Sequence, residues 1–577
     1  MIIAETPRHR DQLYPIALIA LSLFFFVAGA RWIWLYRNGQ PVDADEAGYL
    51  SLALVDYFAL VRGGVSSWIT TVLGPGVQPP VVLSLASLSL YLSDGPNIFA
   101  AFVVPLLSGV GCIISTFYLG RAISSPHLGM MAAILVASCP LVLDRSRNFH
   151  FSLPATLVLT LCLLAMIKSE RFIRIGWAVM FGLFLGLLPL TRTMTIAFLP
   201  GVIIAAVIHT VADRTGRRKR IAILIGSLLV ATLTSATWLW PNGEFVFSYL
   251  LNFGYGSRAA EFGAEHTFLG LDAWKTMLMI FHADIYFPHL LLIIVGCAAA
   301  ILVGLRSATT FSAAAMSPIT PAVIVVAEAL IALVSSRNTG SAFEAPIIPA
   351  CLLISTWGLL QISDRIYYRA LFSVFVIAMS IMTTFPLLDL RTPFSSIWSV
   401  NLPIIGGVIM TDGRGAMQKY ESDAGLGPYT VAEPISAEEG YAWLRLDKDT
   451  QSAVAELAGS SAMIATGFRH YVYNVNSINL QRLVATGTQF EARQVEPSIT
   501  GQSVDGYRNW LNGEAKDTCV LLTSETVRGN FLPLVDPDNM RKAAEDSGFN
   551  AVRHMRTPDN QNITLWTKNN PPSGCHK

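Results

Sequence analysis

Long apolar runs recur along the chain, and short polar segments separate them. A helix of about 20 apolar residues crosses about 30 Å of hydrocarbon, so runs of this length predict membrane-spanning helices. About eleven runs fit, near residues 14–36, 97–119, 128–143, 151–167, 175–190, 194–212, 221–240, 276–304, 318–336, 345–362 and 370–388. The pattern therefore predicts a polytopic α-helical membrane protein.

Two further helical stretches follow the first run, at residues 45–61 and 78–92. The second opens with Gln78-Pro79-Pro80, and prolines fit the first turn of a helix. Because about fifteen residues are too few for a full span, we expect this helix to lie along the membrane surface. Residues 37–96 would then form the first outer loop, with two juxtamembrane helices.

Basic residues support this topology. If neither stretch crosses, the clusters 168–174 and 214–220 both lie on the cytoplasmic side, as the positive-inside rule requires. Arg8, His9 and Arg10 likewise favour a cytoplasmic N-terminus. The acidic segment after the first run is then delivered to the outer face.

The composition changes after Leu388 to that of a soluble domain. We therefore expect a transmembrane module over residues 1–389 and an α/β domain outside the membrane over residues 390–577. Apolar β-type runs predict strands at residues 462–465, 519–522 and 563–566, and helical periodicity predicts helices at 438–457 and 538–547.

The composition restricts the kinds of functional site that the sequence can be expected to form. Hydrophobic residues make up 53% of the chain and charged residues only 14%. Because a charged side chain in or near hydrocarbon is costly, we expect each one there to have a structural or functional role. The seven cysteines show no zinc-type or iron–sulfur spacing. Cys519 and Cys575 lie in the polar tail, where a disulfide can form if the tail is extracytoplasmic.

Three acids, Asp43, Asp45 and Glu46, cluster at the start of residues 45–61. One interpretation is structural: Asp43 caps the helix and Glu46 completes a capping box, with Asp45 favoured by the helix dipole. The other is catalytic, because a carboxylate at a membrane edge can accept a proton from an attacking hydroxyl.

The same topology places cations and histidines on the outer face. They are Arg147 and His150 between two spans, Arg192 in a very short turn, Arg337 at the end of a span, and Arg258, His266 and Lys275 on a long outer loop, residues 241–275. Such groups can neutralise a departing phosphate in a partly desolvated site. Each also has a structural interpretation: Arg192 as a snorkelling residue that pins a helical hairpin, and Arg147 as an interfacial anchor paired with Asp144.

Several short motifs resemble those of GT-C membrane glycosyltransferases, in particular protein O-mannosyltransferases, aminoarabinose transferases and rhizobial lipopolysaccharide galacturonosyltransferases. The resemblance covers roughly residues 14–390. It rests on Asp45-Glu46 with Tyr49 after the first span, on Gln78-Pro79-Pro80, Gly120-Arg121 and Leu190-Thr191-Arg192, and on Pro346-Ile347-Ile348-Pro349.

The resemblance implies a GT-C fold in which Asp45 activates the acceptor and Arg192 lies near the phosphate of the carrier lipid. Tyr49 would belong to the substrate site. This chain has Ser152-Leu153-Pro154 where the group often has Asp before Leu-Pro, and Gln78 where it has Lys. No cofactor is certain; a divalent cation, if one is used, would be held by Asp45 and His150.

We therefore expect an inverting hexosyl- or pentosyltransferase in a bacterial inner membrane. It would move a sugar from a polyprenyl-phosphate donor to a lipopolysaccharide, polysaccharide or protein acceptor at the periplasmic face, with no nucleic-acid partner. Two alternatives stay open: a transporter or flippase of a lipid-linked envelope precursor, and a non-catalytic envelope assembly protein. No second copy of the 43–60 pattern, which a transporter with internal repeats would show, is found.

Overall fold

A computed structural model describes residues 8–93, 95–256, 258–259, 267–307, 311–338, 340, 342–390, 397–403, 406–413, 437–459, 462–570, 572 and 575. The chain divides into two compact units, and each is described by itself. The first unit comprises Met1–Trp32, Leu73–Val82 and Phe102–Gly413. The second comprises Ile33–Val72, Leu83–Ala101 and Arg414–Lys577.

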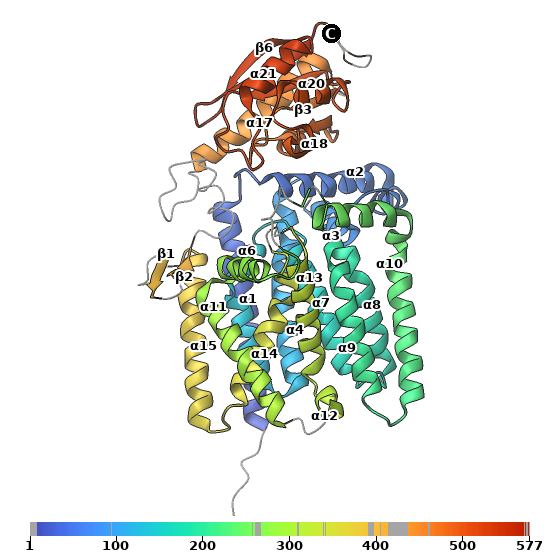
Figure 1. Cartoon of the computed structure of the whole chain (residues 1–577), viewed down its shortest axis with the longest axis vertical. Helices are drawn as coiled ribbons and strands as arrows, with labels where there is room; N and C mark the ends of the chain where they lie inside the picture. Colours follow the sequence, from blue (N-terminus) through green and yellow to red (C-terminus); the bar gives the residue numbers. More distant parts are fainter. Residues whose placement is uncertain are drawn as a thin grey trace, which may run out of the picture. The chain divides into compact units, whose positions relative to one another are not determined.

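The first unit is a bundle of apolar helices. Figure 1 shows α4, α7, α8, α9 and α10 of this bundle side by side. Its helices are α1 (Arg8–Tyr36, whose end belongs to the second unit), α4 (Val103–Ile123), α5 (Pro126–Ser138), α6 (Pro140–Arg145), α7 (Ser152–Lys168), α8 (Ile175–Thr191), α9 (Leu199–Val211), α10 (Arg217–Gly254), α11 (Leu271–Ser307), α12 (Phe311–Met316), α13 (Thr320–Ser335), α14 (Ile348–Leu360) and α15 (Ile366–Leu387). Short 3₁₀ turns precede α4, α9 and α14, at Ile98–Phe102, Thr193–Phe198 and Ala345–Ile347.

The core of the first unit lies along α4, α5, α7 and α14, which are buried over most of their length. Peripheral helices present apolar side chains outward instead; Ile225, Leu229 and Leu233 of α10 are exposed. This is the distribution expected when the surrounding solvent is hydrocarbon. An antiparallel hairpin of β1 (Ile397–Leu402) and β2 (Gly406–Asp412) completes the unit.

Among the described residues, seven helices are long and apolar enough to cross a membrane. They are Leu13–Tyr36, Ala44–Val72, Ile98–Ile123, Thr193–Val211, Arg217–Gly254, Leu271–Arg306 and Ile366–Leu387. Six of them match predicted spans, and the seventh, Ala44–Val72, contains the helix predicted at residues 45–61. The other five of the eleven predicted spans correspond to shorter apolar helices of 10–17 residues. The mostly helical architecture is confirmed, and the number of crossings stays a prediction.

The second unit begins with α2 (Ala44–Val72) and α3 (Pro80–Leu92, whose start belongs to the first unit). Gly64 interrupts α2 with a φ of 71° and a ψ of −170°. A positive φ costs glycine little, so the chain can turn there without strain. The helix predicted at residues 45–61 therefore corresponds to the part of α2 before this break.

The rest of the second unit is an α/β domain, as predicted. Its five-stranded sheet has the order β4-β3-β5-β7-β6, with β3 parallel to β4 and β5 and the other pairs antiparallel. The strands are β3 (Met463–Thr466), β4 (Glu491–Gln494), β5 (Val520–Ser524), β6 (Phe549–Arg556) and β7 (Asn562–Lys568). The helices are α17 (Ala437–Ala458), α18 (Val475–Thr486), α19 (Pro497–Thr500), α20 (Val504–Asn512) and α21 (Pro537–Asp546).

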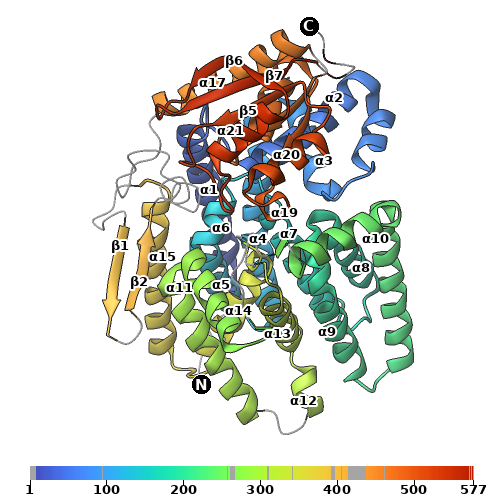
Figure 2. The same ribbon diagram turned by 45° about the horizontal axis from the view of Figure 1, so that its top comes forward.

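Side chains alternate across this sheet and build two apolar layers. Val520 and Leu522 of β5 pack with α17 and α18, whereas Leu521 between them packs with α20 and α21. Figure 2 shows the sheet with helices on its two faces. Helices thus cover both sides of the sheet, which explains why its central strands read as continuous apolar runs.

The predicted outer loop at residues 241–275 is partly wrong. Helix α10 continues through Pro241 to Gly254, and α11 begins at Leu271. Pro241 does not end the helix because Trp238 before it and Val246 after it are both anchored in a buried apolar cluster. Asn242 also donates its side-chain amide to the Trp238 carbonyl at 3.0 Å. Tertiary packing overrides the local proline signal.

Cys519 and Cys575 form a disulfide that joins the start of β5 to the C-terminal segment, with Cα atoms 5.6 Å apart. The five other cysteines are free thiols. The pairing that the sequence left open is therefore present in the structure.

Helices α8 and α10 approach each other closely at glycines. A Cβ added at Gly182 would lie 2.2 Å from the Ser227 carbonyl oxygen, and one at Gly186 would lie 2.5 Å from that of Ala231. Small residues at such positions let two apolar helices pack backbone to backbone.

We expect Gly182→Ala to destabilise the protein by about 1–3 kcal/mol, because the added methyl group forces α8 and α10 apart. Thermal unfolding in detergent micelles measures this. Gly226→Ala is the matched control, since a Cβ at Gly226 on α10 meets no atom within 4 Å. Equal midpoints for the two variants would contradict the close approach.

Candidate active site

The three acids at the start of α2 have different environments. The Asp43 carboxylate accepts the Glu46 backbone N–H at 2.8 Å, as a helix cap does. Glu46 is fully buried, and its carboxylate is hydrogen-bonded and ion-paired to the Arg37 guanidinium. Asp45 is exposed, and Tyr49, one turn later, is partly buried. Asp45 is therefore the most accessible of the three acids.

The C-terminal domain contacts α2 within the second unit. Asn476, at the start of α18, donates its side-chain amide to the Ala44 carbonyl at 2.8 Å. Further along α2, Arg62 lies 4.6 Å from the centroid of the Phe58 ring and donates to the Gly487 carbonyl at 2.9 Å. Helix α18 is thus attached to α2 at two points, and the first of them lies between Asp43 and Asp45.

The Asn476 contact depends on a well-formed helix start. Asn474 caps α18 by accepting the backbone N–H groups of Asn476 and Ser477 at 2.9 and 3.2 Å. This cap fixes the first turn of α18 and therefore the position from which the Asn476 amide reaches α2.

Arg192 occupies the end of α8 in the first unit. It has extended backbone geometry, and its side chain is buried. Its Nη1 donates to the Ser152 hydroxyl at 2.9 Å and to the Ala342 carbonyl at 2.7 Å, while its guanidinium lies 5.0 Å from the centroid of the Phe343 ring. Ser152 also lies 2.9 Å from Nδ1 of His150. The structure therefore brings together two predicted site residues, Arg192 and His150, through one hydroxyl.

Most of the His150 ring is enclosed by protein. Burial, together with the positive charges of Arg145 and Arg192, lowers the pKa of His150 well below its ordinary value. The imidazole is therefore neutral at physiological pH, and it can accept or donate a hydrogen bond according to its tautomer.

Asp144 and Arg147 form the pair that the structural interpretation predicted. The Asp144 carboxylate lies 3.9 Å from Arg145 and 3.7 Å from Arg147. Arg147 is also hydrogen-bonded to the Leu387 carbonyl and lies 3.9 Å from the centroid of the Trp32 ring. It thereby joins the loop after α6 to the ends of α15 and α1. Its predicted contact with substrate stays a prediction.

The other predicted site residues are more dispersed. Arg337 is exposed, and its backbone N–H donates to the Gly254 carbonyl at the end of α10, at 2.9 Å. The guanidinium of Arg258, which follows Gly254 by four residues, lies over the Phe253 ring. Lys275 is exposed on α11, and His266 lies outside the described residues.

Sequence patterns missed Arg37 and Asn476, which make the contacts described above, and they also missed a pair of interacting acids, Glu344 and Asp284. Glu344 is fully buried, and burial and the Asp284 carboxyl raise its pKa well above its ordinary value. A single Arg directly after an apolar run was a signal for Arg37. Nothing in the local sequence points to Asn476.

In the part of the chain that the structure describes, no three His, Cys, Asp or Glu side chains are grouped so as to hold a metal ion. Asp45 and His150, the ligands predicted for a divalent cation, belong to different units. The metal site stays a prediction.

Comparisons with known proteins agree with the resemblance found in the sequence. A family model described as dolichyl-phosphate-mannose-protein mannosyltransferase matches residues 77–240. No curated protein was found to match the chain by sequence.

Solved structures match over nearly the whole chain. ArnT from Cupriavidus metallidurans in the apo state has 13% identity and a TM-score of 0.54, over 96% of this chain and 98% of that one. The same protein bound to undecaprenyl phosphate has 13% identity and a TM-score of 0.52, over 97% and 98%. The oligosaccharyltransferase AglB from Archaeoglobus fulgidus, with an inhibitory peptide and a dolichol-phosphate, has 12% identity and a TM-score of 0.50, over 88% and 69%. The predicted GT-C fold is confirmed.

We expect Arg37→Met to destabilise the protein by about 3–5 kcal/mol, because it leaves the Glu46 carboxylate buried without its guanidinium. Adding Glu46→Gln should restore most of the loss, since the second change removes the buried charge. Thermal unfolding of the two single variants and the double variant gives the coupling energy.

The control is Arg174→Met, which breaks the exposed Arg174–Glu170 pair at 2.6 Å. It should cost about 0–1 kcal/mol. A loss of similar size for the two arginines would show that Arg37 and Glu46 are not a buried pair.

We expect Asn476→Asp to loosen the start of α2, because a carboxylate cannot donate to the Ala44 carbonyl and repels it. The loss should be about 1–3 kcal/mol locally. Hydrogen exchange of the backbone amides at residues 44–50 measures it. Asn512→Asp makes the same change at an exposed position of the same domain and should leave this exchange unaltered. Unchanged exchange in both variants would mean that α18 does not hold α2.

Proposed function

We propose that this chain, which has the GT-C fold, is a membrane glycosyltransferase that uses a polyprenyl-phosphate sugar as donor. The observation that carries the proposal is the fold match with an ArnT bound to undecaprenyl phosphate, which extends over 97% of this chain. The acceptor would be an envelope polysaccharide, glycolipid or protein, and the sugar a hexose or pentose.

The proposed reaction is a direct displacement. An acceptor hydroxyl oxygen forms a bond to the anomeric carbon, the bond from that carbon to the phosphate oxygen breaks, and the hydroxyl proton passes to a carboxylate. Attack opposite the leaving group inverts the anomeric centre. The lipid phosphate leaves with the electron pair of the broken bond and needs positive charge near it.

Asp45 is the proposed base. A carboxylate oxygen of Asp43 accepts the hydrogen bond that caps α2, and Glu46 forms a buried ion pair with Arg37. Both of these acids are therefore suited to shaping the helix start, whereas the exposed side chain of Asp45 is accessible to an acceptor. A base must come within hydrogen-bond reach of the hydroxyl that it deprotonates.

Arg192 is the proposed partner of the donor phosphate. The Ser152 hydroxyl, the Ala342 carbonyl and the face of the Phe343 ring orient its guanidinium. A planar guanidinium held in this way is suited to a phosphate. His150, neutral and linked through Ser152, would adjust its hydrogen bond as charge develops on the phosphate.

The disulfide between Cys519 and Cys575 supports the proposed topology. Disulfides persist in oxidising compartments and are rare in the cytosol. We therefore place the α/β domain on the periplasmic side of a bacterial inner membrane and the N-terminus in the cytoplasm, with the sugar transferred at the periplasmic face.

Transfer from a panel of radiolabelled polyprenyl-phosphate hexoses and pentoses to an envelope extract tests the proposal. We expect the wild type to transfer label from at least one donor, and Asp45→Asn to lower kcat by about 10²–10⁴-fold because it removes the base. Parallel reactions with a chelator test whether a divalent cation is needed.

Asp56→Asn is the matched control, because Asp56 is a buried acid about three turns along the same helix. It should transfer label at the wild-type rate. Equal rates for Asp45→Asn and Asp56→Asn would refute the assignment of the base. Absence of transfer by the wild type across the panel would count against a glycosyltransferase and favour a transporter or an assembly protein.

A further inference from the structure

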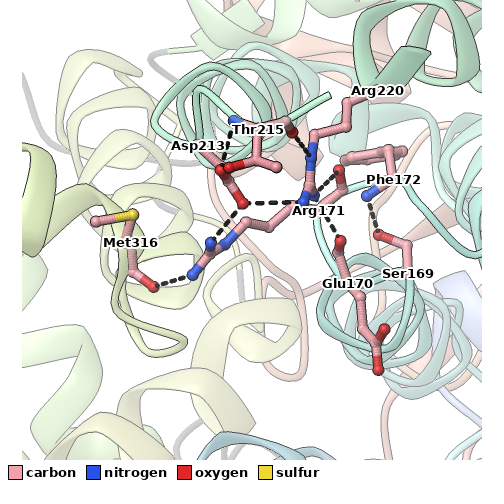
Figure 3. A network of polar contacts seen from close by, with 8 residues as sticks. All are labelled: Ser169, Glu170, Arg171, Phe172, Asp213, Thr215, Arg220 and Met316. Carbon is pink, nitrogen blue, oxygen red and sulfur yellow. Dashed lines mark hydrogen bonds and ion pairs between the residues drawn. The ribbon is translucent and has the colours of Figure 1, made fainter. Parts of the chain in front are cut away.

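Two loops of the first unit are clamped together by one buried arginine. Figure 3 shows Arg220, from the first turn of α10, reaching the loop between α7 and α8. Its guanidinium donates to the carbonyls of Glu170 and Arg171 at 2.8 and 3.0 Å, to the Thr215 carbonyl at 2.9 Å, and to the Asp213 carboxylate at 2.9 Å. The loops that end α7 and α9 therefore form one fixed surface.

The backbone of the first loop has an uncommon shape. Glu170, Arg171 and Phe172 have φ angles of 51°, 60° and 64°. Three consecutive non-glycine residues in the left-handed region are unfavourable unless their surroundings hold them. The Arg220 donors and the buried Phe172 ring do so, and the turn directs Ile173 and Arg174 to the exposed surface.

The two acidic residues of this surface, Asp213 and Glu170, are both paired with arginines. Asp213 accepts from Arg171 at 3.0 Å, from Arg220, and from the Thr215 backbone N–H at 2.9 Å. The Thr215 N–H and the two guanidiniums lower the pKa of Asp213, so it stays ionised. Glu170 is paired with Arg174 at 2.6 Å.

Four cations remain beside the clamp: Arg214, Arg217, Arg218 and Lys219. All four are exposed, and none has an ion-pair partner among the described residues. Three of them lie on the first turn of α10, whose cap Gly216 has no side-chain acceptor. Because the N-terminal end of a helix dipole is itself positive, the dipole adds to their repulsion and an external anion would offset both.

The neighbouring surface is apolar. Ile173 and Ile175, on either side of Arg174, are 46% and 61% exposed, and Ile225 of α10 is 61% exposed. Arg218 and Ile225 are seven residues apart on one helix, or about 10 Å along its axis. Cations that lie this close to lipid-facing apolar side chains are at the level of phospholipid headgroups.

We propose that Arg214, Arg217, Arg218 and Lys219 form a binding surface for the headgroups of anionic phospholipids. The clamp holds the two loops in place, Ile173 and Ile175 contact the acyl region, and the four cations contact headgroup phosphates. The surface lies at the opposite ends of α7 and α8 from Ser152 and Arg192, so it is independent of the proposed active site.

The test is the affinity of the full-length protein, in a neutral detergent, for phosphatidylglycerol and for phosphatidylcholine, measured by native mass spectrometry. We expect the wild type to prefer phosphatidylglycerol by about tenfold or more, since each basic residue near a headgroup contributes measurably. In the variant R214Q/R217Q/R218Q/K219Q, the preference should fall to within about twofold of unity. A threefold rise in salt should weaken it in the wild type.

Two further variants separate charge from folding and from general electrostatics. R214K/R217K/R218K keeps the charge and should keep the preference. R493Q/R508Q/R541Q/R553Q neutralises four exposed arginines of the α/β domain, each of which has an acidic partner, and should also keep it. Loss of the preference in this second variant would reveal a net-charge effect and overturn the proposal.

Three other results would contradict the proposed headgroup-binding surface. A wild type without preference, or a quadruple glutamine variant that keeps it, would refute the surface. Displacement of phosphatidylglycerol by millimolar inorganic phosphate would show that the site takes a free phosphate instead of a lipid headgroup, and would likewise overturn the proposal.

Discussion

A charged side chain that leaves water at the edge of an apolar bundle must keep polar partners, and this requirement shapes the ends of the helices. Arg192 and Arg147 meet it with backbone carbonyls, a hydroxyl, a carboxylate and aromatic faces. The partners of each arginine come from more than one segment of the chain, so one arginine fixes several segments at once. Removal of such an arginine would leave carbonyls and carboxylates unsatisfied where water cannot replace it.

Sequence patterns predicted the features that depend on composition and periodicity. The apolar helices, the α/β domain with its strands near residues 463, 520 and 563, and the helix that begins at the acidic cluster all follow from runs that any local window detects. The Asp43 cap could be predicted as well, because its chemistry is local.

The partners of the site residues could not be predicted, because they are far apart in the sequence. Arg192 meets Ala342 across 150 residues, and Asn476 meets Ala44 across 432. The predicted helix end at Pro241 was wrong for a related reason. A proline locally favours the end of a helix, but the packing of Trp238 and Val246 on either side keeps this helix intact. Tertiary contacts decide these positions, and a single sequence does not record them.

The two ends of α7 and α8 use arginine in opposite ways. At one end, Arg192 is buried, and a hydroxyl, a backbone carbonyl and an aromatic face orient its guanidinium. At the other end, the Arg220 guanidinium donates hydrogen bonds to backbone carbonyls and to the Asp213 carboxylate, and exposed cations lie next to it in the sequence. A charge that is buried and oriented has few positions from which a ligand can reach it, so it can select one phosphate group. Charges that are exposed and repeated can bind phosphate groups in many arrangements, as a membrane surface requires.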